Sequence, residues 1–172
     1  LLQKALQEVL SNNVHQAGSK VDDKRLRFDF KYDGTINDDQ IIEVENLVNE
    51  KIKTDVLTVI KDMDIEEAKK MGAMALFSEK YGKIVRVVNI VDSVELCGGT
   101  HVVKSSDIGS FAIISVESKG QNVYRIEATT DSNIIPELFE QIKPYNEDMM
   151  KLLNKAANIV ENASLEDIVL DF

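Results

Sequence analysis

Cysteine, histidine and proline are scarce in this sequence: its 172 residues include one cysteine, two histidines and two prolines. A single cysteine excludes an internal disulfide framework and suits a reducing compartment. The sequence contains no apolar run of about 18 residues, which excludes a membrane-spanning helix, and its N-terminus lacks the basic-then-apolar pattern of a signal peptide. We therefore expect a cytoplasmic protein with no membrane partner.

Positive charge is also in short supply. The sequence has 20 Lys and Arg against 30 Asp and Glu, a net charge of −10. This balance argues against a general electrostatic nucleic-acid binder, which presents a basic face. One local basic cluster could still contact RNA, and a solvated strand and loop surface explains it equally well. The cluster consists of Lys20, Lys24, Arg25, Arg27 and Lys31.

Apolar spacing predicts two amphipathic helices in the first third of the chain. In residues 1–10 the apolar side chains recur on one helical face. A second helix begins after Asn37, where Gln40 completes a capping box, and its apolar stripe extends to Ile52. Residues 11–24, rich in Ser, Asn, Gly and Asp, are predicted to form a loop.

Five segments are predicted to be strands. Residues 25–32 alternate apolar and polar side chains, the pattern of a half-buried strand. Residues 83–91 form a Val and Ile run, which indicates a central strand buried on both faces. The other three are residues 54–60, 111–117 and 123–129, the last two joined by a hairpin turn.

The remaining elements complete an α+β fold. A capping box of Asp64 and Glu67 predicts a short helix to about Lys70, and residues 72–82 are predicted to be a compact turn region with one helical face, made by Ala73, Leu76 and Phe77. We expect a mostly antiparallel sheet with helices packed on one side, followed by a long C-terminal helix.

That last helix, predicted over residues 132–163, carries a heptad pattern. Its apolar residues alternate four-residue and three-residue steps, which predicts a seam that packs on a partner. Pro144 lies inside the seam and should kink or split the helix. Residues 164–172 are predicted to be a tail. The seam consists of Leu138, Ile142, Tyr145, Met149, Leu152, Ala156, Ile159 and Ala163.

The only cysteine and one of the two histidines lie close together, in Leu96-Cys97-Gly98-Gly99-Thr100-His101. A thiolate and an imidazole are donors that zinc prefers. The two glycines have no Cβ, so the backbone can turn tightly and another group can approach closely. Spacing alone leaves two interpretations open, because zinc needs three or four ligands and a lone cysteine is more often a buried apolar residue.

The whole string resembles the second metal motif of the alanyl-tRNA synthetase editing domain, a domain shared with threonyl-tRNA synthetases and with free-standing alanyl-tRNA editing proteins. Five other stretches resemble the same family and follow its order over about residues 1–130. They are Gln16-Ala17-Gly18-Ser19, Leu26-Arg27-Phe28-Asp29-Phe30, Gly72-Ala73-Met74-Ala75-Leu76-Phe77, Glu79-Lys80-Tyr81-Gly82 and Arg125-Ile126-Glu127-Ala128.

The resemblance implies a site. Cys97 and His101 match two zinc ligands, and the family's HxxxH motif, whose second histidine would fall immediately before Leu1, supplies the other two. Gln16 matches a pocket glutamine that can hydrogen-bond a serine hydroxyl, and Arg125 matches an arginine near the tRNA end. Tyr124 replaces the family's usual basic neighbour. Residues 1–131 therefore correspond to an editing domain without its HxxxH segment, and we expect weak zinc binding and poor deacylation.

The implied function is zinc-assisted hydrolysis of mischarged Ser-tRNA(Ala) or Gly-tRNA(Ala), with the acceptor end of tRNA(Ala) as partner. The sequence has no ATP-binding motif, so ATP and magnesium would belong to an aminoacylation domain upstream. A free-standing trans-editing deacylase is one alternative. The other is a non-catalytic oligomerisation module that self-associates through the C-terminal helix, with Cys97 buried.

Overall fold

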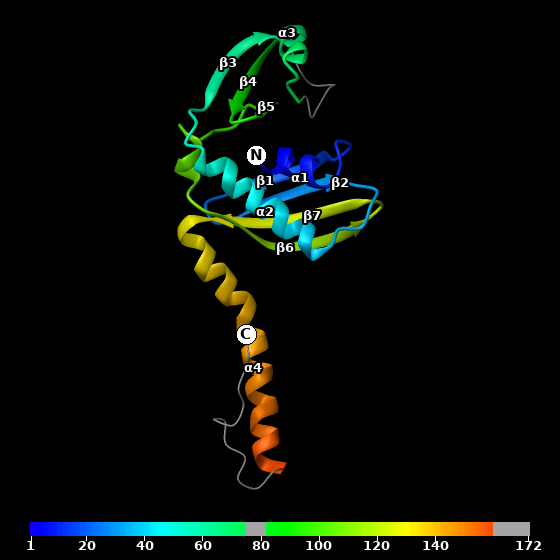
Figure 1. Cartoon of the computed structure of the whole chain (residues 1–172), viewed down its shortest axis with the longest axis vertical. Coiled ribbons are helices and arrows are strands. Elements are labelled where there is room, and N and C mark those ends of the chain that lie inside the picture. The colour runs from blue at the N-terminus through cyan, green and yellow to red at the C-terminus, as the bar shows by residue number, and fades with distance from the viewer. Residues whose placement is uncertain (75–81, 160–172) are drawn as a thin grey trace. The chain divides into compact units, whose positions relative to one another are not determined.

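The computed structural model describes residues 1–74 and 82–159, with side chains in the last helix through residue 155. One compact unit spans Leu1–Ile134 and a second begins at Ile135. In chain order the elements are α1 (Leu2–Val9), β1 (His15–Val21), β2 (Leu26–Lys31), α2 (Asp38–Lys53), β3 (Val59–Asp64), α3 (Ile65–Lys70), β4 (Ile84–Ile90), β5 (Ser93–Leu96), β6 (Phe111–Gly120), β7 (Val123–Thr130) and α4 (Ile134–Ile159), with 3-10 turns at Ser105–Ile108 and Asp131–Asn133 (Figure 1). This is the α+β fold predicted from the sequence. In the described part of the chain no helix has the length and apolar character needed to cross a membrane.

Four strands form an antiparallel sheet in the order β1-β2-β7-β6. The three strands predicted at 25–32, 111–117 and 123–129 are confirmed as β2, β6 and β7. The hairpin between β6 and β7 turns at Gln121 and Asn122, both with positive φ, as a two-residue hairpin turn requires.

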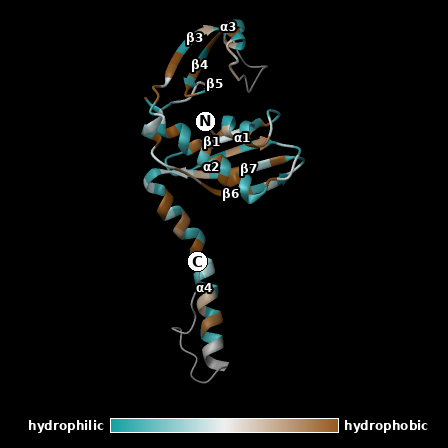
Figure 2. Ribbon diagram, viewed as in Figure 1, coloured by the Kyte–Doolittle hydropathy of each residue, from teal (hydrophilic) through white to brown (hydrophobic). Residues whose placement is uncertain are grey.

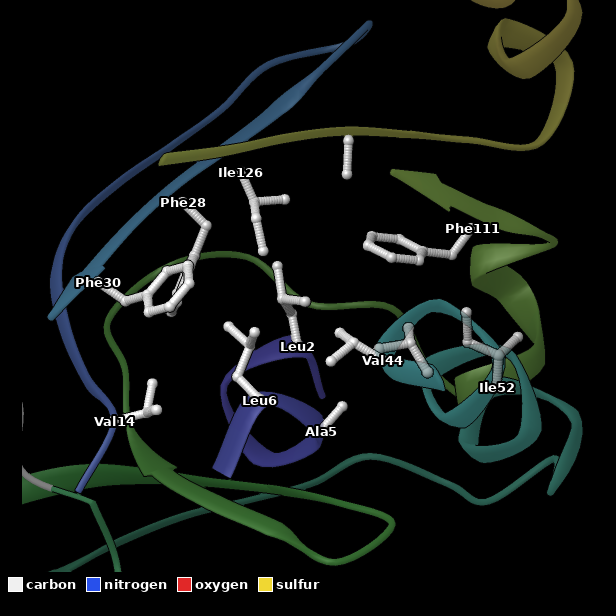
Figure 3. Packing of buried hydrophobic residues seen from close by; sticks show 12 residues of the cluster. Leu2, Ala5, Leu6, Val14, Phe28, Phe30, Val44, Ile52, Phe111 and Ile126 are labelled. Atoms are coloured by element: carbon white, nitrogen blue, oxygen red, sulfur yellow. The ribbon is translucent and has the colours of Figure 1, made fainter. Parts of the chain in front are cut away.

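Both predicted N-terminal helices pack on one face of this sheet. The Asn37 side chain accepts from the Gln40 N–H at 2.9 Å, and the Gln40 side chain accepts from the Asn37 N–H at 3.1 Å, so the predicted capping box is confirmed. Figure 3 shows Phe28, Phe30 and Ile126 of the sheet directed toward Leu6 of α1. The apolar faces of α1, α2 and the sheet therefore form one core.

The remaining strands form a second antiparallel sheet, in the order β3-β4-β5. The sequence predicted one sheet and did not indicate that there are two. The middle strand of this second sheet is β4, which confirms the central strand predicted at 83–91. On one face Val85 and Val87 pack against Ala68 of α3. Asp64 caps α3 by accepting from the Glu66 N–H at 2.8 Å, so the helix is confirmed but its reciprocal box with Glu67 is not formed.

Two segments were predicted with the wrong secondary structure. Residues 11–24 were predicted to be a loop but include β1, an edge strand. Its polar sequence gives no strand pattern, and its backbone hydrogen bonds come from pairing with β2. Residues 54–60 are mostly not a strand: Thr54 ends α2, where its hydroxyl donates to the Lys51 carbonyl, and β3 begins only at Val59.

The long C-terminal helix, α4, runs from Ile134 to Ile159 and continues across Pro144, so the proline does not split it. Hydrophobic residues recur along its length (Figure 2). The seam residues Leu138, Ile142 and Leu152 are 38%, 51% and 67% exposed. The predicted seam positions from residue 156 onward, the tail at 164–172, and Leu76 and Phe77 of the predicted turn lie outside the residues whose side chains are described.

Candidate functional site

The turn that carries Cys97 follows β5 directly. Cys97 is half-buried and its thiol is free. Its N–H donates to the backbone oxygen of Arg86 on β4 at 3.2 Å. Strand pairing therefore continues one residue past β5, and Cys97 is held at the end of a sheet rather than in an unsupported loop.

Two glycines follow Cys97, and the first of them, Gly98, provides space. Neither adopts a positive φ, so a left-handed backbone does not explain them. A Cβ added to Gly98 would meet no atom within 4 Å, and Gly98 lines a cavity. The structure thus favours the interpretation that the absent side chain leaves room for a group to approach the backbone beside Cys97.

The cavity beside this turn has a volume of about 540 Å³. Leu2 of α1, Phe28 of β2 and Ile52 of α2 form part of one wall, and Ile90 of β4 and Cys97 form part of another. The cavity therefore lies between the two sheets of the first unit, and most of its lining is apolar. Such a concave, mainly apolar space with a few polar groups is typical of a small-molecule site.

The first turn of α1 faces the same space as the cysteine. Leu1 and Leu2 line the cavity together with Cys97 and Gly98. The beginning of this helix and the glycine turn are about 95 residues apart in the sequence. The fold brings them to one cavity.

Gln16 lies on strand β1, not in the predicted loop, and lines the cavity with Ser19. It pairs with Phe30, whose side chain is in the core, so Gln16 faces the helix side of the sheet. The Gln16 Nε2 donates to the Ser19 Oγ at 2.9 Å. This hydrogen bond orients the amide of Gln16.

Arg125 is on the opposite face of the same sheet. It pairs with Asp29 in the register of β2 and β7, and its Nε and second guanidinium nitrogen donate to the two carboxylate oxygens of Asp29, each at 2.8 Å. Strand residues alternate between faces, so Arg125 points away from the face that carries Phe28 and Phe30. The structure does not bring Arg125 and Gln16 together.

Glu95 is a cavity residue that the sequence analysis missed. It is the charged side chain among the described residues of the lining, and the Ser93 Oγ donates to its Oε1 at 2.8 Å. Ser93 itself is 2% exposed. Glu95 and Cys97 are two residues apart at the end of a strand, and this spacing could have predicted a shared face if β5 had been recognised.

Arg86 is the second residue that was missed. One of its guanidinium nitrogens donates to the carbonyl of Cys97 at 2.6 Å and to the carbonyl of Gly99 at 2.8 Å. The strand prediction at 83–91 included Arg86, but no sequence pattern indicated that Arg86 lies opposite Cys97, where its side chain reaches the glycine turn that follows β5.

His101 is more exposed than Cys97 and is not part of the cavity lining. Desolvation, followed by the charge of Arg86, lowers the pKa of His101 below its ordinary value. A lowered pKa favours the neutral imidazole, which is the form that binds metal. The shift therefore favours the form of His101 that could act as a metal ligand.

The described residues supply fewer donors than zinc requires. Within residues 1–74 and 82–159, no three His, Cys, Asp or Glu side chains gather in a metal-binding arrangement. His15, predicted to lie in a loop, is instead the first residue of β1 and pairs with Lys31, on the other face from Gln16. Cys97 and His101 alone do not complete a site of three or four ligands.

Comparison with known proteins gives the family. Residues 85–127, which include the glycine turn and Arg125, match the threonyl and alanyl tRNA synthetase second additional domain. The alanine–tRNA ligase of Lysinibacillus sphaericus is 46% identical over 170 residues, covering 98% of this chain and 18% of that protein. The alanine–tRNA ligase of Staphylococcus aureus strain JH9 is 54% identical over 131 residues, covering 76% of this chain and 15% of that protein.

The chain thus spans less than a fifth of the length of these relatives. The match nevertheless extends over almost the whole chain in the first comparison, and it confirms the resemblance found from the sequence motifs. The chain belongs to the alanine–tRNA ligase family and corresponds to a segment that contains the second additional domain.

Proposed function

We propose that this chain carries part of the site that hydrolyses the ester bond of tRNA(Ala) bearing the wrong amino acid, with Ser-tRNA(Ala) and Gly-tRNA(Ala) as substrates. One observation carries the proposal: Cys97 and Gly98 of the family's turn line a single cavity with Gln16 and the start of α1. The names of the matched domain and relatives support tRNA as the partner. They also favour a synthetase segment over a free-standing deacylase.

The physical need for such a site is clear from the size of the substrates. Serine differs from alanine by one hydroxyl group, and glycine lacks one methyl group. A binding pocket resolves differences of this size by roughly 1–3 kcal/mol, which gives too many errors for protein synthesis. A second cavity that admits the wrong aminoacyl group and hydrolyses its ester corrects them.

The polar groups of the cavity suit an aminoacyl ester. The Gln16 amide is oriented by its hydrogen bond to Ser19, and its carbonyl oxygen would accept a hydrogen bond from the serine hydroxyl. The Glu95 carboxylate, held by Ser93, would pair with the α-ammonium group. The apolar walls strengthen both interactions by excluding water from the side chain of the substrate.

Zinc enters the proposal through the Cys97 thiolate and the neutral His101 imidazole, with two more donors supplied, as the resemblance implies, by residues that precede Leu1 in the family. Bound zinc would polarise the ester carbonyl or the attacking water. The open space beside Gly98 would let the ester approach this point. ATP and magnesium have no role in this hydrolysis.

Any contribution of Arg125 to tRNA binding would be made at the outer face of the sheet. Its guanidinium is engaged with Asp29 there, on the side of the sheet opposite Gln16. We therefore propose that Arg125 contacts the tRNA backbone outside the cavity and does not touch the aminoacyl group.

The test measures zinc content and hydrolysis of Ser-tRNA(Ala) and Gly-tRNA(Ala), with this chain and with one extended upstream by about two helical turns. Cys97→Ala and Gly98→Ala should each reduce hydrolysis at least about tenfold without unfolding the chain. Gln16→Leu should reduce hydrolysis of the seryl ester more than that of the glycyl ester.

Gln7→Leu is the matched control, because Gln7 donates to the Val14 carbonyl at 3.1 Å and does not line the cavity. It should leave both rates unchanged. If the extended chain hydrolyses neither ester, or if Cys97→Ala hydrolyses both at the original rate, the proposed editing site is wrong.

Self-association through α4 is a second, separate proposal. The exposure of Leu138, Ile142 and Leu152 on one heptad seam favours it. Sedimentation should show a concentration-dependent dimer that Ile142→Asp disrupts and Glu140→Gln, on the same helix, does not. A monomer at all concentrations would exclude this interface.

A further inference from the structure

We infer that Arg86 is the positioning residue of the glycine turn: its guanidinium ties the carbonyls of Cys97 and Gly99 together and so fixes where the Cys97 thiol and the His101 imidazole are presented. The inference rests on the proposed function, because it assigns a role within the same site. Arg86 does not touch the substrate in this scheme.

The hydrogen bonds of Arg86 show how the turn depends on this residue. A single guanidinium nitrogen reaches the Cys97 carbonyl at 2.6 Å and the Gly99 carbonyl at 2.8 Å. The backbone oxygen of Arg86 accepts from the Cys97 N–H at 3.2 Å. The same residue thus bonds the turn through both its main chain and its side chain, and it spans the segment from the residue before Gly98 to the residue after it.

Two glycines in succession make such an external restraint necessary. Glycine loses more conformational entropy on ordering than any other residue, and neither Gly98 nor Gly99 has a side chain that packs. Hydrogen bonds from a charged donor are stronger than neutral ones. The Arg86 guanidinium therefore restricts the backbone of a turn whose own glycine residues do not restrict it.

The strand that carries Arg86 is well suited to hold it still. Val85 and Val87, on either side, are 6% and 3% exposed and pack in the core beneath α3. Strand alternation then directs Arg86 to the other face, which is the face of Ile90 and the cavity. Arg86 is fixed at its base by buried neighbours and reaches the turn with its charged end.

The test compares Arg86→Met, Arg86→Lys and Lys61→Met in this chain. Lys61→Met is the matched control, because Lys61 is an exposed cation on β3 of the same sheet. Two rates are measured. The first is the rate of hydrogen exchange of the Cys97 amide, followed by NMR, and the second is the rate at which iodoacetamide alkylates Cys97, measured for all variants at one pH.

If Arg86 acts as a clamp on two carbonyls, both Arg86 variants should raise both rates roughly tenfold, while Lys61→Met leaves them unchanged. Lysine keeps the charge but lacks the planar donor set. An Arg86→Lys variant with the original rates would therefore overturn the clamp and leave only a charge effect. Unchanged rates in both variants would also overturn it.

Two further measurements distinguish a failure of the Arg86 clamp from unfolding of a variant and from a failure of the proposed function. Circular dichroism checks that each variant is folded, and if Arg86→Met is not, the local rates in Arg86→Lys decide. Hydrolysis of Ser-tRNA(Ala) by the unsubstituted extended chain tests the proposed function independently. If the Arg86 variants raise both rates but the extended chain is inactive, the clamp is confirmed and the editing activity is rejected. If the rates do not change but the extended chain is active, the clamp is rejected and the editing activity is supported.

Discussion

Replacing Lys51 by methionine should destabilise the first unit and loosen the part of it that carries the glycine turn. Lys51 is a residue of α2 and is only 8% exposed. Its ammonium lies 2.6 Å from a carboxylate oxygen of Asp92, in the turn between β4 and β5, and 3.1 Å from one of Glu8 on α1. The ammonium thus joins the two helices to the second sheet, and methionine keeps its apolar stem while removing the charge.

The expected cost follows from how unequally the three charges are buried. Breaking a fully buried pair costs about 3–5 kcal/mol because the remaining ion has no partner, whereas an exposed pair contributes about 0–1 kcal/mol. The carboxylates of Asp92 and Glu8 are 42% and 36% exposed, so they regain water when Lys51 is removed. We therefore expect Lys51→Met to cost about 1–2 kcal/mol.

Removing the two carboxylates instead of the ammonium should cost more stability. In the double variant Glu8→Gln and Asp92→Asn the ammonium stays buried without a carboxylate, and we expect a loss of about 3 kcal/mol. The assay is equilibrium unfolding in urea, with Lys53→Met, an exposed lysine of the same helix, as the control that should change little. The reasoning fails if removal of the ammonium costs more than removal of both carboxylates.

The pH dependence has a definite sign. Desolvation opposes charging of Lys51, but its hydrogen bonds to Asp92 and Glu8 outweigh this and raise the pKa of Lys51. Desolvation also opposes charging of Asp92, and the hydrogen bond from Lys51 lowers the pKa of Asp92 on balance. The contribution of Lys51 is lost as pH rises through its raised pKa, and that of Asp92 as pH falls through its lowered pKa. The cost of Lys51→Met should therefore be constant around neutral pH and shrink in acid.

Three other stability predictions follow from single contacts and use the same urea assay. Asp29→Asn should lower the free energy of unfolding at neutral pH, because the hydrogen bond from Arg125 lowers the pKa of Asp29 in the folded chain. That contribution is lost as pH falls through the lowered pKa, so the difference in stability between variant and original should shrink in acid. A stability difference independent of pH would contradict this. Asn37→Ala removes the confirmed cap of α2 and should cost about 1 kcal/mol, whereas Asn46→Ala, at an exposed position of the same helix, should cost less. Leu6→Ala, at a fully buried position, should cost about 2–5 kcal/mol, and Leu57→Ala, 63% exposed, should stay within about 0.5 kcal/mol.

The elements that sequence predicted well are those whose signal is carried by their own residues. The alternation in 25–32 became β2 because Phe28 and Phe30 face the core at 6% and 0% exposure. The capping box at Asn37 is a local hydrogen-bond pattern and was found where it was predicted. Neither requires knowledge of a distant partner.

The elements that it missed depend on partners elsewhere in the chain. β1 is polar and exposed, and it is a strand only because β2 lies beside it. β5 is four residues long, too short for a periodic signal, so the shared face of Glu95 and Cys97 was not visible. The reach of Arg86 to the Cys97 and Gly99 carbonyls requires the register of β4 and β5, which no local pattern encodes.

The acidic balance of the chain can be reconciled with an RNA partner through the outer face of the four-stranded sheet. Three of its cations are paired with neighbouring carboxylates: Arg125 with Asp29, Arg25 with Glu127 and Lys119 with Glu117. Such pairs neutralise the long-range field that would draw phosphate to a bare basic patch. Association through this domain would then gain little from electrostatic steering, and selectivity would depend on short-range fit to the aminoacyl group. That is the kind of recognition a cavity of about 540 Å³ beside Cys97 can provide.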